Sequence, residues 1–192
     1  MSKEPSAFES ALLRRLARMS PPERAALRRS LAFPPGEYIG AMGVVEPYVA
    51  NMSFEQRAAV YLFAGLYADI ERVRPETEAF RDDEISQTIG VALRVYLARG
   101  QNDTRRPAVE RRLLTVLDSE LDGLKAHLRP LLRLMSTDGV SWSWARLMRD
   151  LKNWNNATSK TQLQWAKDFY RVANDFGAQE EENNLKPTVQ ED

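Results

Sequence analysis

The chain has 192 residues, no cysteine, and 27 basic against 27 acidic side chains. This length can bury a hydrophobic core without cross-links, and the lack of cysteine excludes disulfides, thiolate catalysis and cysteine zinc sites. The N-terminus has no leader-like apolar run, and the longest apolar run, residues 58–68, is too short to span a bilayer. We therefore expect a cytoplasmic protein that makes no membrane contact.

The charges are distributed unevenly along the chain. Residues 1–34 and 105–149 each carry a net charge of +4, whereas residues 35–104 carry −5 and residues 178–192 carry −4. Arginine supplies 21 of the 27 basic side chains, and its planar fork suits phosphate better than lysine does. A genomic base composition that raises arginine and alanine together explains the bias equally well. Composition therefore permits nucleic-acid binding but does not require it.

Serine-initiated helix starts recur along the chain. Five serines are followed three residues later by an acid or an amide, which is the spacing of a capping box. These predicted starts are Ser6, Ser20, Ser53, Ser119 and Ser159. A short helix is also expected over Tyr38–Val45, before Pro47, with others over residues 85–98 and from Pro107. Gly90, inside one of these helices, is expected to mark a close contact between helices.

The predicted fold class is all-α, because no segment shows the alternating pattern of a strand. We expect two small helical bundles, an N-terminal bundle over residues 1–100 and a C-terminal bundle over residues 105–176. Residues 177–192 lack periodicity and are strongly acidic, which predicts a disordered tail.

All four tryptophans lie between Val140 and Arg171. Apolar residues recur there at three- and four-residue steps from about Ser143, and again after Ser159, which predicts a helical hairpin with the tryptophans in its core. Basic side chains flank the same hairpin. They are Arg146, Arg149, Lys152, Lys160, Lys167 and Arg171.

The sequence offers no specific signal for catalysis. Motifs for zinc hydrolases, phosphate loops and dinucleotide binding are absent, and the single histidine, His127, is predicted to be structural. Asp118, Glu120 and Asp122 form a carboxylate cluster that the dipole of a helix start explains. A metal-dependent nuclease built on that cluster is a minor alternative. We predict no metal site and no cofactor.

What remains is a surface of paired cations on the predicted helices. Phosphate backbones need spaced cations, and such contacts carry little sequence information. Arg129 and Arg133 are four residues apart and therefore share a helix face. The pairs are Arg28 and Arg29, Arg105 and Arg106, Arg111 and Arg112, Arg129 and Arg133, and Arg149 and Lys152.

Four ordered segments point to a family. They are AALRRSL at Ala25–Leu31, TIGVALRVYL at Thr88–Leu97, VERRLLTVLDSE with LKAHLRPLLRLM at Val109–Glu120 and Leu124–Met135, and WARLMRDLKNW with WAKDFY at Trp144–Trp154 and Trp165–Tyr170. Their order and spacing resemble the small subunit of the type I-E CRISPR Cascade complex, the CasB family. The resemblance covers roughly residues 25–171.

The resemblance implies a non-catalytic, all-helical subunit of a crRNA-guided antiviral complex. Its expected partners are other Cascade subunits, a second copy of itself, the crRNA–target DNA heteroduplex and the displaced single-stranded DNA of the R-loop. The family pattern also implies that Glu110 pairs with an arginine. The candidate nucleic-acid-binding residues are Arg28, Arg29, Arg111, Arg112, Arg129, Arg133, Arg149, Lys152 and Lys160. The alternative is a purely structural helical adaptor whose arginines contact acidic protein surfaces.

Overall fold

The computed structural model describes residues 6–71, 87–99, 103–156 and 160–171. Within these ranges the regular structure is helical and contains no strand, which confirms the all-α prediction. No helix in the described ranges has both the length and the apolar character needed to cross a bilayer. The elements are α1 Ala7–Ala17, α2 Pro21–Ser30, α3 Ile39–Val49, α4 Phe54–Ile70, α5 Ile89–Arg99, the short 3-10 helix η2 Asp103–Arg105, α6 Arg106–Leu117, α7 Leu121–Thr137, α8 Trp144–Lys152 and α9 Thr161–Tyr170.

Three of the predicted serine caps begin helices as expected. Ser6 accepts a hydrogen bond from the backbone N–H of Glu9, and the Glu9 carboxylate accepts one from the Ser6 N–H at 2.8 Å. Ser20 and Glu23 form the capping box of α2, and the Ser53 hydroxyl caps α4. These side chains satisfy backbone N–H groups that the first helical turn leaves unpaired.

The predicted cap at Ser119 is wrong by one residue. The Ser119 hydroxyl donates to the carbonyl oxygen of Thr115 at 2.6 Å, so it closes α6 instead of opening α7. Glu120 is the N-cap residue of α7. Ser159 lies outside the described residues, and Lys160 stands at the N-cap position of α9. The predicted acidic tail also lies outside them.

The helix predicted over Tyr38–Val45 is longer than expected. It continues through Pro47 and ends at Val49 as α3. Proline removes one backbone hydrogen bond from a helix interior. Val45 and Val49 are fully buried, so packing of this apolar face offsets the lost bond.

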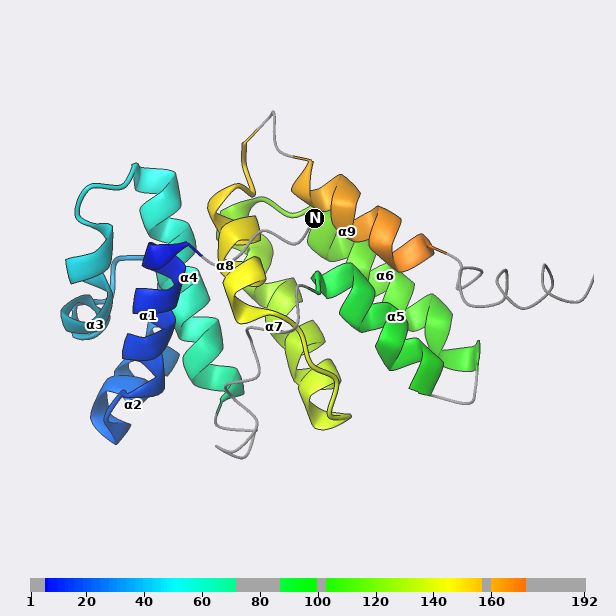
Figure 1. Ribbon diagram of the computed structural model, residues 1–192, viewed down its shortest axis with the longest axis horizontal. Helices are drawn as coiled ribbons and strands as arrows, with labels where there is room; N and C mark the ends of the chain where they lie inside the picture. The colour runs from blue at the N-terminus through cyan, green and yellow to red at the C-terminus, as the bar shows by residue number, and fades with distance from the viewer. Residues whose placement is uncertain (1–5, 72–86, 100–102, 157–159, 172–192) are drawn as a thin grey trace, which may run out of the picture.

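The helices form two groups with α7 and α8 between them. Figure 1 shows α1 to α4 at one end of the molecule and α5, α6 and α9 at the other. The contacts of α8 are chiefly with α4 and α1, and those of α5 are chiefly with α9. Contacts therefore cross the predicted boundary near residue 100, and the division into bundles 1–100 and 105–176 stays a prediction.

The tryptophans hold the central helices together. Trp144 meets the rings of Phe63 and Tyr67 of α4 at 5.9 and 5.0 Å in edge-on geometry. Trp154, at the end of α8, meets Trp165 of α9 at 5.1 Å. All four tryptophans are at most 2% exposed, which confirms their predicted place in the core.

A buried carboxylate fastens α8 to α9. Asp150 accepts one hydrogen bond from the indole N–H of Trp165 at 2.7 Å and one from Arg146 Nε at 2.8 Å. Burial raises the pKa of Asp150 above its usual value, although these two donors oppose the shift. The aromatic hairpin is thus held together by buried hydrogen bonds as well as by apolar packing.

Candidate nucleic-acid interface

A row of three cations follows one face of α7. Lys125, Arg129 and Arg133 are spaced at four-residue steps, which places them above one another on a helix. We call them the α7 cation row. The Lys125 ammonium donates to the carbonyl oxygen of Phe33 at 2.8 Å, so the row begins beside the chain that follows α2.

Both arginines of the row grip one carboxylate. Arg129 donates from Nε to Asp69 Oδ2 at 2.9 Å and from Nη2 to Oδ1 at 2.8 Å. Arg133 makes the same pair of bonds at 2.8 and 2.7 Å. Asp69 lies in α4 and is only 4% exposed, whereas the arginine side chains are 40% and 48% exposed. Arg129 and Arg133 therefore share a single buried carboxylate.

The Asp69 carboxylate stays ionised at neutral pH. Burial alone would raise the pKa of Asp69, but hydrogen bonds and charge from Arg129 and Arg133 outweigh it and hold the pKa below its usual value. Two guanidinium groups around one carboxylate leave a net charge of +1. Charge-assisted, two-pronged bonds of this kind fix the orientation of both planar groups.

Arg28 and Arg29 lie in the last turn of α2. Arg28 is half-buried and Arg29 is exposed. Their helix packs closely on α4, where a Cβ added to Gly65 would meet a methyl group of Leu31 at 2.7 Å. The helices that carry the α2 arginines and the α7 cation row therefore both pack against α4.

Arg111 and Arg112 are exposed on α6. Among the described residues, neither guanidinium has a hydrogen-bond or ion-pair partner. The expected pairing of Glu110 with an arginine is wrong for the described residues. Glu110 instead accepts a hydrogen bond from the hydroxyl of Tyr170 at 2.5 Å.

Arg149 and Lys152 face α1 instead of open solvent. Arg149 Nη2 bonds the carboxylate of Glu9 at 2.9 Å, and that carboxylate is 3% exposed. The Lys152 ammonium stands 4.5 Å from the ring centroid of Phe8. Both side chains hold α8 against α1. Helix packing is therefore enough to explain why cations stand at these two positions.

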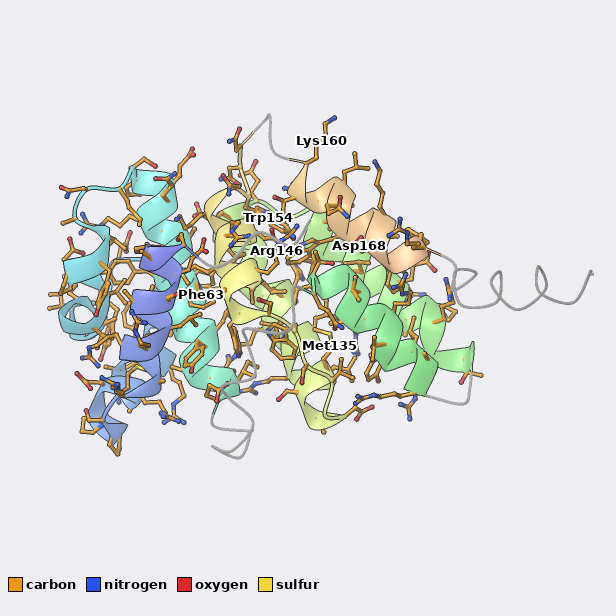
Figure 2. The ribbon with its side chains drawn as sticks, viewed as in Figure 1. Phe63, Met135, Arg146, Trp154, Lys160 and Asp168 are labelled. Carbon is orange, nitrogen blue, oxygen red and sulfur yellow. The ribbon has the colours of Figure 1, made fainter. Side chains whose placement is uncertain are left out.

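Lys160 stands at the start of α9. It is exposed, and Figure 2 shows its side chain projecting away from the helices. The candidate residues are thus not gathered at one place. The structure puts two of them in the α7 cation row, two in the last turn of α2, two on α6, two against α1 and one at the tip of the hairpin.

A family model described as CRISPR-associated protein Cse2 matches residues 23–170. The chain belongs to the Cse2 family. It is 36% identical over 161 residues to a CRISPR-associated protein Cse2 of Thermus thermophilus, covering 83% of this chain and 82% of that protein. The resemblance seen in the sequence is confirmed.

Solved Cse2 structures share the fold. CasB from Thermus thermophilus aligns with a TM-score of 0.67 at 31% identity, over 88% of this chain and 99% of that one. A chain of a CRISPR RNA-guided surveillance complex aligns with a TM-score of 0.69 at 28% identity, over 85% of this chain and 92% of that one. Cse2 proteins are non-catalytic subunits of the crRNA-guided Cascade surveillance complex of CRISPR defence.

The three carboxylates considered for a nuclease lie where α6 ends and α7 begins. Asp118 ends α6, Glu120 caps α7 and Asp122 lies in its first turn, and all three are exposed. Within the described residues, no group of three histidine, aspartate or glutamate side chains could hold a metal ion. The lone His127 is exposed on α7.

Sequence reasoning missed two residues that contact or continue the Arg129 and Arg133 pair, Lys125 and Asp69. Lys125 continues the four-residue repeat of Arg129 and Arg133, a signal that periodicity alone could have supplied. Asp69 is the one acid within the otherwise apolar run of α4, and a buried carboxylate requires a partner. Which partner it has depends on how α4 crosses α7.

Proposed function

We propose that this Cse2 chain stabilises the target and displaced DNA strands of the R-loop through its arginine surfaces. The α7 cation row and the arginine pairs of α2 and α6 are the groups assigned to phosphate. The crRNA–target DNA heteroduplex and a second copy of the chain are the neighbours that the family resemblance supplies. The proposal starts from membership of the chain in the Cse2 family of Cascade subunits.

The observation that supports it best is the double grip of Arg129 and Arg133 on Asp69. Four hydrogen bonds of 2.7–2.9 Å orient the two guanidinium groups while leaving roughly half of each side chain in contact with solvent. An arginine that is already oriented loses less conformational entropy when it meets a phosphate. Exchange of a DNA duplex for an RNA–DNA heteroduplex is nearly balanced in free energy, so a few such contacts can tip it.

The structural adaptor is the competing function. It has its own support, because Arg149 and Lys152 serve packing, and Arg111 and Arg112 would suit an acidic protein surface equally well on charge alone. The two functions differ in what the arginines contribute after the complex has formed. Phosphate contacts affect strand binding, whereas protein contacts affect assembly.

The test uses the reconstituted Cascade complex with a complementary double-stranded target. The lifetime of the R-loop is measured at several salt concentrations for the wild-type chain and for Arg111→Gln with Arg112→Gln. We expect a shorter lifetime and a shallower salt dependence, because each lost phosphate contact removes about one released counterion. Arg14→Gln, an exposed arginine on α1 outside the candidate set, is the matched control.

Two outcomes would overturn the proposal. One is an unchanged R-loop lifetime and salt dependence in the double variant. The other is a loss of subunit from the complex with normal lifetime once the subunit is supplied in excess, which is the behaviour of an adaptor. Far-ultraviolet circular dichroism of each variant establishes that the helices are intact.

A further inference from the structure

The exposed side of α9 combines cations with an exposed aromatic ring. Its solvent-facing positions carry four cationic or aromatic residues, which are Lys160 at the N-cap, Lys167 in the last turn, then Tyr170 and Arg171, beside the exposed Leu163 and Gln164. These positions recur at three-, four- and seven-residue steps and so share one side of the helix. The only acid of α9 is Asp168, which is buried and bonded to Thr88 at 2.6 Å. The α9 face, as we call these four residues, is therefore basic and aromatic.

Tyr170 is both exposed and rigid. Its side chain is 43% exposed, yet its hydroxyl donates to Glu110 Oε1 at 2.5 Å. Its ring stands edge-on against Phe169, with centroids 5.1 Å apart and planes at 84°. Phe169 is itself 2% exposed, so the tyrosine ring rests on the core. An exposed aromatic ring held at its edge and at its hydroxyl has little rotamer freedom left to lose on binding.

Two arginines from neighbouring helices lie near the end of α9. The guanidinium carbon of Arg106 lies 5.8 Å from the centroid of Phe169, on the α6 side of the aromatic pair. Arg94 of α5 donates to the carbonyl oxygen of Arg171 at 3.2 Å. The guanidinium group of Arg94 therefore lies at the C-terminal end of α9. The nearest described carboxylate partner, Glu110, is already bonded to Tyr170. Arg94 of α5, Arg106 of α6 and Lys167 of α9 thus bring positive charge to the end of α9, where Tyr170 is exposed.

We infer that the α9 face, together with Arg106, is a stacking platform for an unpaired base of single-stranded nucleic acid. Tyr170 supplies the stacking surface, and Lys167, Arg171 and Arg106 bind the flanking phosphates. Grooves that combine an aromatic ring with cations bind single strands without base readout, because every base has a π-face. This inference rests on the proposed function, since it assigns one strand contact within the same subunit.

The test separates stacking from charge. Fluorescence anisotropy measures binding of labelled single-stranded DNA to the reconstituted complex, with one oligonucleotide carrying bases and a matched one carrying abasic sites. Tyr170→Leu is expected to weaken binding of the base-containing strand by about tenfold, within the range for loss of one base–aromatic stack. Binding of the abasic strand and the salt dependence stay as in the wild type. Tyr170→Phe, which keeps the ring and loses only the bond to Glu110, should weaken binding of the base-containing strand much less than Tyr170→Leu does.

Arg106→Gln and Arg171→Gln are expected to behave in the opposite way. Each lowers the slope of log affinity against log salt by about one for both oligonucleotides, since a phosphate contact does not depend on the base. If Tyr170→Leu leaves binding of both strands unchanged, or weakens both equally, the platform is refuted. Loss of affinity in the Arg111 and Arg112 variants, with none in Tyr170→Leu, refutes the platform alone. No effect in any of these variants refutes the proposed function as well.

Discussion

Gly90 of α5 lies directly against the backbone of Trp165 in α9. A Cβ at position 90 would stand 2.1 Å from the carbonyl oxygen of Trp165 and 3.0 Å from Cβ of Asp168. Thr88, two residues before Gly90, donates its hydroxyl to Asp168 at 2.6 Å. The close helix contact that the sequence predicted for Gly90 is confirmed, and it joins the first helix after residue 87 to the last helix of the described chain.

Gly90→Ala should therefore destabilise the protein. The contact is with backbone, which cannot rotate away, so α5 and α9 must separate at a cost of about 1–3 kcal/mol. Gly123→Ala in α7 is the matched control, because an added Cβ there meets nothing within 4 Å. That variant should gain about 0.5–1 kcal/mol from helix propensity. Urea denaturation followed by circular dichroism measures both, and equal effects of the two substitutions would contradict the expected close contact.

Asp69→Asn should loosen the α7 cation row. An amide cannot accept four charge-assisted bonds, and the two arginines are left facing each other across the site. We expect a loss of about 2 kcal/mol in the free energy of unfolding at pH 7. Asp138→Asn, which removes an exposed pair with Arg105 at 3.5 Å, should change stability by less than about 1 kcal/mol. Similar losses in both variants would mean that the buried pairing of Asp69 with Arg129 and Arg133 stabilises the fold no more than an exposed ion pair does.

The pH dependence of stability should carry two effects of opposite sign. Asp69 has a lowered pKa in the folded state, so its contribution is present above its unfolded pKa of about 3.9 and is lost as the pH falls through the folded pKa. The stability difference between wild type and Asp69→Asn should therefore shrink below about pH 4. It is measured by urea denaturation between pH 7 and pH 2.5.

Asp150 should behave in the reverse sense. Burial raises its folded pKa, so its contribution is greatest below the unfolded pKa of about 3.9 and declines as the pH rises through the folded pKa. Wild type should gain stability relative to Asp150→Asn as the pH falls from 7 towards 4. A difference that is independent of pH over that range would show that the carboxyl group titrates normally.

Arg149→Gln should affect stability, whereas Arg111→Gln should not. Removing the Arg149 guanidinium leaves the Glu9 carboxylate, 3% exposed, with fewer bonds, at an expected cost of about 2 kcal/mol. Arg111 is an exposed helix residue, and its replacement should change stability by less than about 0.5 kcal/mol. Thermal denaturation of the two variants side by side distinguishes packing arginines from surface arginines.

Local patterns in the sequence were sufficient for much of the fold. Helix periodicity, serine caps at Ser6, Ser20 and Ser53, the tryptophan core and the shared face of Arg129 and Arg133 all depend on residues within one or two turns of each other. Such signals need no knowledge of how one helix packs on another. Where the local pattern was ambiguous, packing decided: buried valines extend α3 through Pro47, and Ser119 closes one helix instead of opening the next.

The tertiary structure alone decided what the charged side chains do. Asp69 meets its arginines across 60 and 64 residues of sequence, Glu9 meets Arg149 across 140, and Glu110 meets Tyr170 across 60. Periodicity predicts which residues share a helix face. Whether that face is exposed or buried depends on the helices that pack across it. The crossings of α4 with α7 and of α1 with α8 turned predicted surface cations into bound ones, because a buried carboxylate in low dielectric must have a cationic or hydrogen-bonding partner.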